Sequence, residues 1–203
     1  KLAANLSMMF NEVDMLDRFE AAAKVGFKGV EYLFPYPYKP EHINEKLSQN
    51  GLTQVLFDLP AGDWDAGDRG LAALPNRIGE FQDGVGLALE YAKALNCGLL
   101  TCLAGVPPAG TDPDKAMQTL VDNMAFAAPL ASEAGAKLLL EPINTRDIPG
   151  YFVNTSAQAI SVLDAVDDEN TWLQYDIYHM QITEGDLAHT IERLRTRIPH
   201  FQI

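Results

Sequence analysis

Three polar side chains that can bind a cation lie where short segments of the chain end. Glu141 follows the apolar run 137–140, Asp176 closes the segment 171–176, and Gln202 lies in the last segment of the sequence. If these segments are consecutive strands of a parallel barrel, their carboxyl ends meet at one rim. Three oxygen donors that converge there would form a site for a hard cation such as Mg²⁺ or Mn²⁺.

Glu141 has two interpretations. The run 137–140 shows little alternation of apolar and polar residues, which is typical of a strand buried on both faces. Pro142 should end regular pairing, because it has no N–H to donate. Catalytic groups of β/α barrels collect at this carboxyl edge. A glutamate in this position could also cap the next helix or form an ion pair with an arginine.

His179 lies three residues after Asp176 and could reach the same site, or form a hydrogen bond within a loop. Strand interiors disfavour aspartate, so the combination favours a functional role. Other polar groups at predicted strand ends could line a pocket or satisfy neighbouring loops: Asn5, Glu31, Asp58 and Thr101. Four aromatic side chains could shield a small polar substrate from water, or simply pack in the core: Phe10, Phe34, Tyr36 and Trp64.

The segments around these residues alternate between strand and helix patterns. The expected strands cover 2–7, 28–34, 52–59, 98–103, 137–140 and 171–176, with a seventh beginning at 199. The expected helices cover 13–25, 40–49, 76–95, 113–133, 155–166 and 185–197. This order predicts an α/β fold with parallel strands and helical crossovers, which is the pattern of a TIM (β/α)8-type barrel.

Three segments carry further expectations. Residues 60–70 are rich in turn-forming and polar residues, which is typical of a functional loop. Pro129 should kink the helix that contains it or end it early. The glycines at 84 and 86 lie inside a predicted helix with no strand before it, which argues against a nucleotide-binding fingerprint.

The number of elements predicts a barrel that lacks its last strand or strands. Six strand–helix units and half of a seventh occupy 203 residues, whereas such barrels typically need about 250. We therefore expect residues 1–203 to form one barrel domain that is incomplete at its C-terminal end and derives from a longer natural protein.

The composition restricts the expected partners. The formal net charge of -13 at pH 7 disfavours nucleic acids and anionic membrane surfaces, which attract basic proteins. No apolar run approaches the roughly 20 residues of a membrane helix, and the N-terminal residues show no signal-peptide pattern. Cys97 and Cys102 are interpreted as reduced core thiols. A cytoplasmic location is therefore predicted.

Several segments match a known family along the whole chain. The most specific are Leu-Pro-Ala-Gly-Asp-Trp at 59–64 and Gln-Tyr-Asp-Ile-Tyr-His-Met-Gln at 174–181. The others are residues 3–8, 29–31, 140–144 and 147–150. Together they resemble the hydroxypyruvate isomerase family, which includes the 2-oxo-tetronate isomerases and lies within the xylose-isomerase-like TIM barrels.

The resemblance implies an isomerase that interconverts a short 2-oxo hydroxy acid with its aldehyde or ketone isomer, such as hydroxypyruvate with tartronate semialdehyde. In that family two glutamates transfer protons, and a divalent metal, Mg²⁺ or Mn²⁺, is held by Glu, Asp, Gln and Glu. Carried over to this sequence, Glu141 is the first catalytic glutamate and a metal ligand, and Asp176 and Gln202 are further ligands. The second glutamate of the family lies beyond Ile203.

We predict substrate contacts from His179, Asp58 and Trp64. His179 could donate a hydrogen bond to a substrate oxygen as charge develops on it. Asp58 departs from the family pattern, which tends to have asparagine before Leu-Pro-Ala-Gly-Asp-Trp. A carboxylate there would weaken the binding of an anionic substrate if it pointed inward, so either it points away or the substrate differs.

Other functions remain open at this point. A ketose 3-epimerase would use the same site on a longer sugar. A DNA endonuclease on a related barrel with several zinc ions is disfavoured by the negative charge and by the small number of histidines, which is four. A truncated binding protein would hold the metal without turnover. The expected partner is a small 2-oxo or hydroxy acid, and the family commonly forms homo-oligomers.

Overall fold

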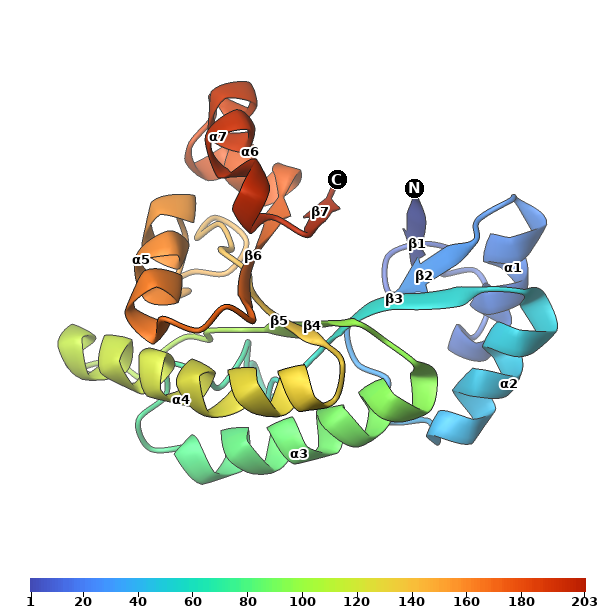
Figure 1. Ribbon diagram of the computed structural model, residues 1–203, viewed down its shortest axis with the longest axis horizontal. Helices are drawn as coiled ribbons and strands as arrows, with labels where there is room; N and C mark the ends of the chain where they lie inside the picture. Colours follow the sequence, from blue (N-terminus) through green and yellow to red (C-terminus); the bar gives the residue numbers. More distant parts are fainter.

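Seven short parallel strands form one curled sheet in a computed structural model that describes all 203 residues. The strands follow chain order: β1 (Ala3–Asn5), β2 (Gly29–Glu31), β3 (Thr53–Asp58), β4 (Leu99–Cys102), β5 (Lys137–Leu140), β6 (Thr171–Asp176) and β7 (His200–Gln202). β1 and β7 are the two edge strands, and they lie on opposite sides of the opening in the curled sheet (Figure 1). The predicted α/β fold of the TIM-barrel type is confirmed by this parallel, sequential order.

Helices connect successive strands and cover the outer face of the sheet, with α3 and α4 side by side beneath it (Figure 1). The α-helices are α1 (Arg18–Lys24), α2 (Pro40–Asn50), α3 (Ile78–Leu95), α4 (Pro113–Glu133), α5 (Ser156–Val166), α6 (Ile177–Thr183) and α7 (Leu187–Leu194). Short 3-10 turns at Met15–Asp17 and Arg195–Arg197 adjoin α1 and α7. None of these helices combines the length and apolar character that spanning a membrane requires.

The sequence of α4 explains how such a helix forms and packs. Asp112 caps its start by accepting a hydrogen bond from the Asp114 N–H at 3.0 Å, and Pro113 occupies the first turn, where no backbone donor is needed. The buried side chains recur every three or four residues and therefore share the face that packs on the sheet: Ala116, Leu120, Met124, Ala127 and Ala131.

Pro129 does not end α4 early, which was one of the two outcomes that the sequence predicted, the other being a kink. The helix continues for four residues beyond it, to Glu133. Ala128 and Ala131, on either side of the proline, are fully or almost fully buried against neighbouring elements. Packing of this face thus outweighs the one backbone hydrogen bond that a proline removes.

The core lies between the sheet and the helices. The leucines of β5 are buried on both faces of the strand, as the unalternating run predicted. Cys97 and Cys102 are free and buried, as predicted, and burial raises the pKa of each thiol to about 12. Both cysteines are therefore protonated packing residues at neutral pH.

The predicted functional loop at 60–70 is fixed to the end of β4 by backbone contacts. Gly70 forms an isolated antiparallel bridge with Ala104, and the N–H of Ala72 donates to the Leu103 carbonyl at 3.3 Å. Gly70 has a φ of 124°, and a Cβ at this position would fall on the Leu103 carbonyl. The close approach of the two backbones therefore requires glycine at position 70.

We predict that Gly70→Ala lowers the free energy of unfolding by about 2 kcal/mol or more, because the side chain adds a clash to an unfavourable φ. The control is Gly67→Ala. Gly67 also has a positive φ, of 104°, but open space where a Cβ would lie, so a loss of only about 1 kcal/mol is expected. Urea unfolding measures both variants. Equal losses would show that the Leu103 contact does not fix the loop.

Candidate active site

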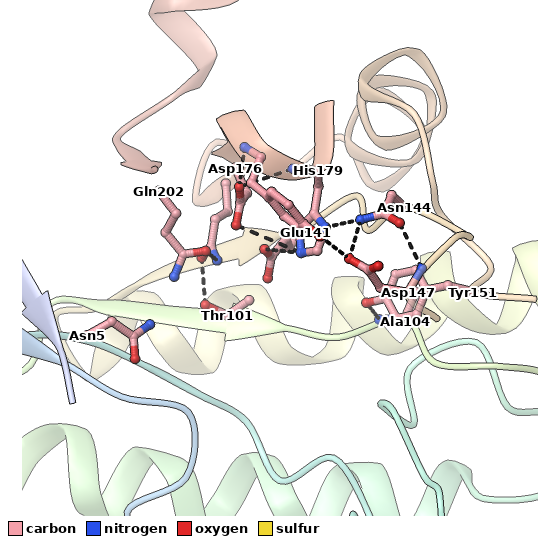
Figure 2. Close-up of polar contacts among 12 residues, drawn as sticks. Asn5, Thr101, Ala104, Glu141, Asn144, Asp147, Tyr151, Asp176, His179 and Gln202 are labelled. Atoms are coloured by element: carbon pink, nitrogen blue, oxygen red, sulfur yellow. Dashed lines mark hydrogen bonds and ion pairs between the residues drawn. The ribbon is translucent and has the colours of Figure 1, made fainter. Parts of the chain in front are cut away.

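Glu141 directly follows β5 and lies at the carboxyl edge of the sheet, with its side chain directed into the group of polar residues in Figure 2. It is only 6% exposed. Burial raises the pKa of Glu141 well above its usual range, and the negative charges of Asp58 and Asp176 add to the rise, while contact with Gln174 opposes it. A raised pKa makes a carboxylate a stronger base than a solvated one, which suits general acid–base chemistry.

Asp176 ends β6 and caps a helix that the sequence prediction missed. Its Oδ1 accepts hydrogen bonds from the N–H groups of Tyr178, at 2.7 Å, and His179, at 3.2 Å. The sequence predicted no helix between the strand at 171–176 and the helix at 185–197, but α6 begins at Ile177. Aspartate at the N-cap supplies the acceptor that the first free N–H groups of a helix need. His179 therefore lies in the first turn of a helix and not in a loop.

The structure brings Glu141, Asp176 and His179 together. One possible ligand atom from each lies within 4.8 Å of the others. The Nε2 atom of His179 is 3.9 Å from Glu141 Oε1 and 3.8 Å from Asp176 Oδ2 (Figure 2). Burial lowers the pKa of His179, and the charges of Asp176 and Asp147 oppose this change. Two carboxylates and one imidazole thus face a common space at the ends of β5 and β6.

Gln202, the third predicted oxygen donor, lies opposite Asp176 in the register between β6 and β7. Its Oε1 accepts a hydrogen bond from Gln174 Nε2 at 2.9 Å, and its Nε2 donates to Glu31 Oε1 at 2.8 Å. An amide oxygen has two lone pairs, so Oε1 retains one for a further partner. The amide is thus held in place by side chains from β6 and β2.

A layer of hydrogen-bonded polar side chains lies next to this site, on the inner face of the curled sheet. Besides the bonds to Gln202, the hydroxyl of Thr101 donates to Gln174 Oε1 at 2.7 Å, and Asn5 Nδ2 donates to Glu31 Oε1 at 3.3 Å. His200 Nε2 lies 2.8 Å from Glu31 Oε2, although its N–H direction is not that of an aligned hydrogen bond. The predicted strand-end groups Asn5, Glu31 and Thr101 therefore belong to one network.

The sequence prediction did not include two members of this layer, Gln174 and His200. Each lies two residues before a predicted ligand on the same strand, Gln174 before Asp176 and His200 before Gln202. Alternate residues of a strand point to the same face. The two-residue spacing was therefore the signal in the sequence that could have identified both.

Asp58 points inward. The alternative that its carboxylate points away from the site is therefore excluded. The residue is 6% exposed at the end of β3. Burial raises the pKa of Asp58 well above its usual range, the Glu31 charge adds to the rise, and contact with Thr101 opposes it. Asp58 is therefore a buried acid next to the polar layer, and no lysine or arginine is among the groups that act on its pKa.

Trp64 lies in the 60–70 loop, packed between two side chains. Its ring centroid is 5.1 Å from that of Phe34, and the guanidinium carbon of Arg69 lies 4.2 Å from its centroid. Arg69 Nη1 also donates to the Trp64 carbonyl at 2.9 Å. These contacts hold the ring in one orientation on the loop that follows β3. A contact between Trp64 and a substrate stays a prediction.

The sequential parallel sheet and the acidic site at its carboxyl edge define a class of protein. A family model described as Xylose isomerase-like TIM barrel matches residues 19–203. The chain belongs to this family, which fits the strand order and the position of Glu141 and Asp176 at the strand ends.

Individual relatives place the chain, within this family, in the hydroxypyruvate isomerase group that the sequence resembles. Hydroxypyruvate isomerase of Escherichia coli is 46% identical over 203 residues, which cover 100% of this chain and 79% of the relative. The 2-oxo-tetronate isomerase of Cupriavidus necator is 47% identical, with coverage of 100% and 78%. A crystal structure described as AP endonuclease, family 2 from Brucella melitensis is 45% identical, with a TM-score of 0.96 and coverage of 99% and 78%.

We predict that Asp58→Asn stabilises the metal-free protein at neutral pH. The pKa of Asp58 is higher in the folded than in the unfolded chain, so folding stability falls as pH rises from about 4 through the folded-state pKa. The asparagine side chain does not ionise, so the variant does not lose this stability as the pH rises. The expected gain is about 1 kcal/mol or more at pH 7, and it should disappear toward pH 4.

Urea unfolding from pH 4 to pH 8, in the presence of a chelator, measures this difference. Asp65→Asn serves as the control, because Asp65 is an exposed carboxylate on the 60–70 loop. A gain for Asp58→Asn that is the same at every pH would mean that the buried charge is not its source.

Proposed function

We propose that this chain carries the site of a metal-assisted isomerase that interconverts a short 2-oxo hydroxy acid, such as hydroxypyruvate or a 2-oxo-tetronate, with its aldehyde or ketone isomer. The observation that carries the proposal is the pair of carboxylates, Glu141 and Asp176, at adjacent strand ends. Its second support is the 46% and 47% identity, over the whole chain, to proteins named hydroxypyruvate isomerase and 2-oxo-tetronate isomerase.

The donor set fits a hard divalent cation. Glu141 and Asp176 face the same space, neither is paired with a lysine or arginine, and burial together with the charges of Asp58 and Asp176 raises the pKa of Glu141. Carboxylate and amide oxygens are the ligands that Mg²⁺ and Mn²⁺ prefer. Glu141, Asp176 and the free lone pair of Gln202 Oε1 would hold the ion. When bound, it would act as a Lewis acid toward a substrate oxygen.

Glu141 would transfer the proton. Isomerisation moves a hydrogen between two adjacent carbons through an enediolate, so one group must remove a proton at the first carbon. The Glu141 carboxylate would take that proton and return it, and its burial beside other acidic groups makes it a stronger base than a solvated glutamate. His179 would donate a hydrogen bond to the substrate oxygen on which negative charge develops.

Asp58 and Trp64 would shape the substrate pocket. A protonated aspartic acid offers one donor and one acceptor, as does the asparagine of the family pattern. Protonation of Asp58, which its raised pKa favours, would remove the conflict with an anionic substrate, so an inward Asp58 does not by itself require a different substrate. Trp64, held by Phe34 and Arg69, would exclude water from one side of the pocket.

The reaction also needs a second acid–base group on the other face of the substrate. The resemblance assigns it to a glutamate on an eighth strand. The 203 residues span 78–79% of the isomerases named above. We propose that an eighth strand, placed between β7 and β1, supplies this group and completes the barrel domain.

We predict isomerase activity on hydroxypyruvate or 2-oxo-tetronates, with added Mg²⁺ or Mn²⁺, in a chain extended through an eighth strand–helix unit. The 203-residue chain alone should be inactive. Glu141→Gln in the extended chain should lower kcat by about 10²-fold or more, because the amide cannot accept the proton. A coupled assay for the aldehyde product measures these rates.

Glu133→Gln is the control for the loss of one negative charge, since Glu133 is exposed at the end of α4. Equal activity in the 203-residue and extended chains would mean that the second proton-transfer group lies within these residues. Turnover of free ketohexoses in place of short 2-oxo acids would assign the site to an epimerase instead.

A further inference from the structure

The inner nitrogen of the His179 ring has a specific partner outside the carboxylate cluster. Its Nδ1 lies 2.7 Å from Nδ2 of Asn144, whose side chain is fully buried in the loop after β5 (Figure 2). Because the two amide ends of an asparagine look alike, such a contact defines the ring only if the orientation of the amide is known.

The neighbours of Asn144 fix that orientation. Its Oδ1 accepts a hydrogen bond from the backbone N–H of Asp147 at 2.9 Å, and its Nδ2 donates to Asp147 Oδ2 at 3.0 Å. A rotated amide would place its oxygen against the carboxylate and its NH₂ against the backbone N–H, and both contacts would be repulsive. The second hydrogen of Nδ2 is therefore available to His179.

The remaining acceptor of this hydrogen is His179 Nδ1. An Nδ1 that accepts cannot carry a proton, so the ring is neutral and its proton lies on Nε2. The Nε2–H group faces Glu141 and Asp176 at distances of 3.9 and 3.8 Å. These distances exceed those of a hydrogen bond, which leaves the donor free for another partner.

We propose that Asn144 and Asp147 are positioning residues that fix His179 as an Nε2–H donor directed into the site. A protonated Nε2 has no lone pair for a cation, so His179 is a donor to the substrate and not a metal ligand. This inference deepens the proposed function and rests on it for the identity of the substrate. The direction of the donor is a property of the protein itself.

Tyr178 extends the arrangement to the surface. Its hydroxyl donates to Asp147 Oδ2 at 2.7 Å, the same oxygen that accepts from Asn144. The hydrogen bonds from Asn144 and Tyr178 lower the pKa of Asp147. Asp147 therefore remains an acceptor at neutral pH. Tyr178 and Asn144 both donate hydrogen bonds to its carboxylate, and Asn144 also donates one to the His179 ring.

The direct test is the position of the imidazole proton in the ¹⁵N-labelled 203-residue protein. Long-range ¹H–¹⁵N correlation spectra at neutral pH distinguish the two tautomers, and His179→Gln assigns the signals among the four histidines. We expect a protonated Nε2 and an unprotonated Nδ1, both unchanged when Mg²⁺ is added. A proton on Nδ1, or loss of the Nε2 proton with Mg²⁺, would overturn the inference.

A paired substitution tests the positioning role at constant net charge. In Asn144→Asp/Asp147→Asn the carboxylate and the amide exchange places, so the group facing Nδ1 becomes an acceptor. The proton should move to Nδ1, and kcat of the extended chain should fall by about 10²-fold, the usual cost of one lost oxyanion donor. Glu45→Gln/Gln49→Glu is the matched control, because it exchanges an exposed amide–carboxylate pair on α2 at constant net charge, and it should retain the original tautomer and kcat.

Calorimetry with Mg²⁺ or Mn²⁺ alone tests the second part of the inference. His179→Gln should leave the metal affinity unchanged, whereas Asp176→Asn should lower it by about 10-fold or more. Equal losses in both variants would make His179 a ligand and overturn the inference. If the predicted tautomer is found but the extended chain has no isomerase activity, the proposed function fails while the positioning of His179 stands.

Discussion

The structure depends on negative charge that is buried without a lysine or arginine partner. Glu31, Asp58 and Glu141 are each almost fully buried, and Asp176 lies beside them, yet none forms an ion pair with lysine or arginine. Water cannot solvate such groups well, so each must be neutralised by a proton, by hydrogen bonds or by a bound cation. The polar layer, the raised pKa values of Asp58 and Glu141 and the fit to a divalent ion are three responses to this one constraint.

The buried carboxylates differ in how well hydrogen-bond donors satisfy them. Glu31 accepts hydrogen bonds from Asn5 and Gln202 and lies 2.8 Å from His200 Nε2, and so is part of the scaffold. Glu141 has no comparable set of donors. A cation or a transferred proton can therefore neutralise Glu141 without breaking hydrogen bonds that hold the fold together. A catalytic carboxylate needs this property.

The sequence contained enough information for the fold and for part of the site. Glu141 could be placed because an unalternating apolar run ends at a proline, and Asp176 because strands disfavour aspartate. Helix α6 could not be predicted from periodicity, since it is only seven residues long and its start depends on the cap that Asp176 provides. The continuation of α4 past Pro129 depends on packing against elements that are distant in the sequence.

The contacts between side chains from distant segments were less accessible still. Asn144 and His179 are 35 residues apart, and their hydrogen bond depends on the conformation of the loop after β5 as well as on the first turn of α6. Asp58 could be recognised as unusual, but its direction could not be determined before the register of β3 and β4 was known. Patterns identify which residues face the interior, whereas their partners depend on how the sheet curls.

The contact between Gln202 and Glu31 has a consequence for the order in which the protein assembles. Every strand pairs with its neighbour in the sequence, so the sheet can grow one strand at a time through relatively local contacts. The Gln202–Glu31 bond joins residues 171 positions apart and closes by far the longest loop among these hydrogen bonds. Closing a loop of that length in the unfolded chain would cost much entropy, whereas little is lost once the strands between the two residues have formed, so we expect this bond to form last. The contact that joins the last strand to β2 thus depends on the correct placement of every strand between them.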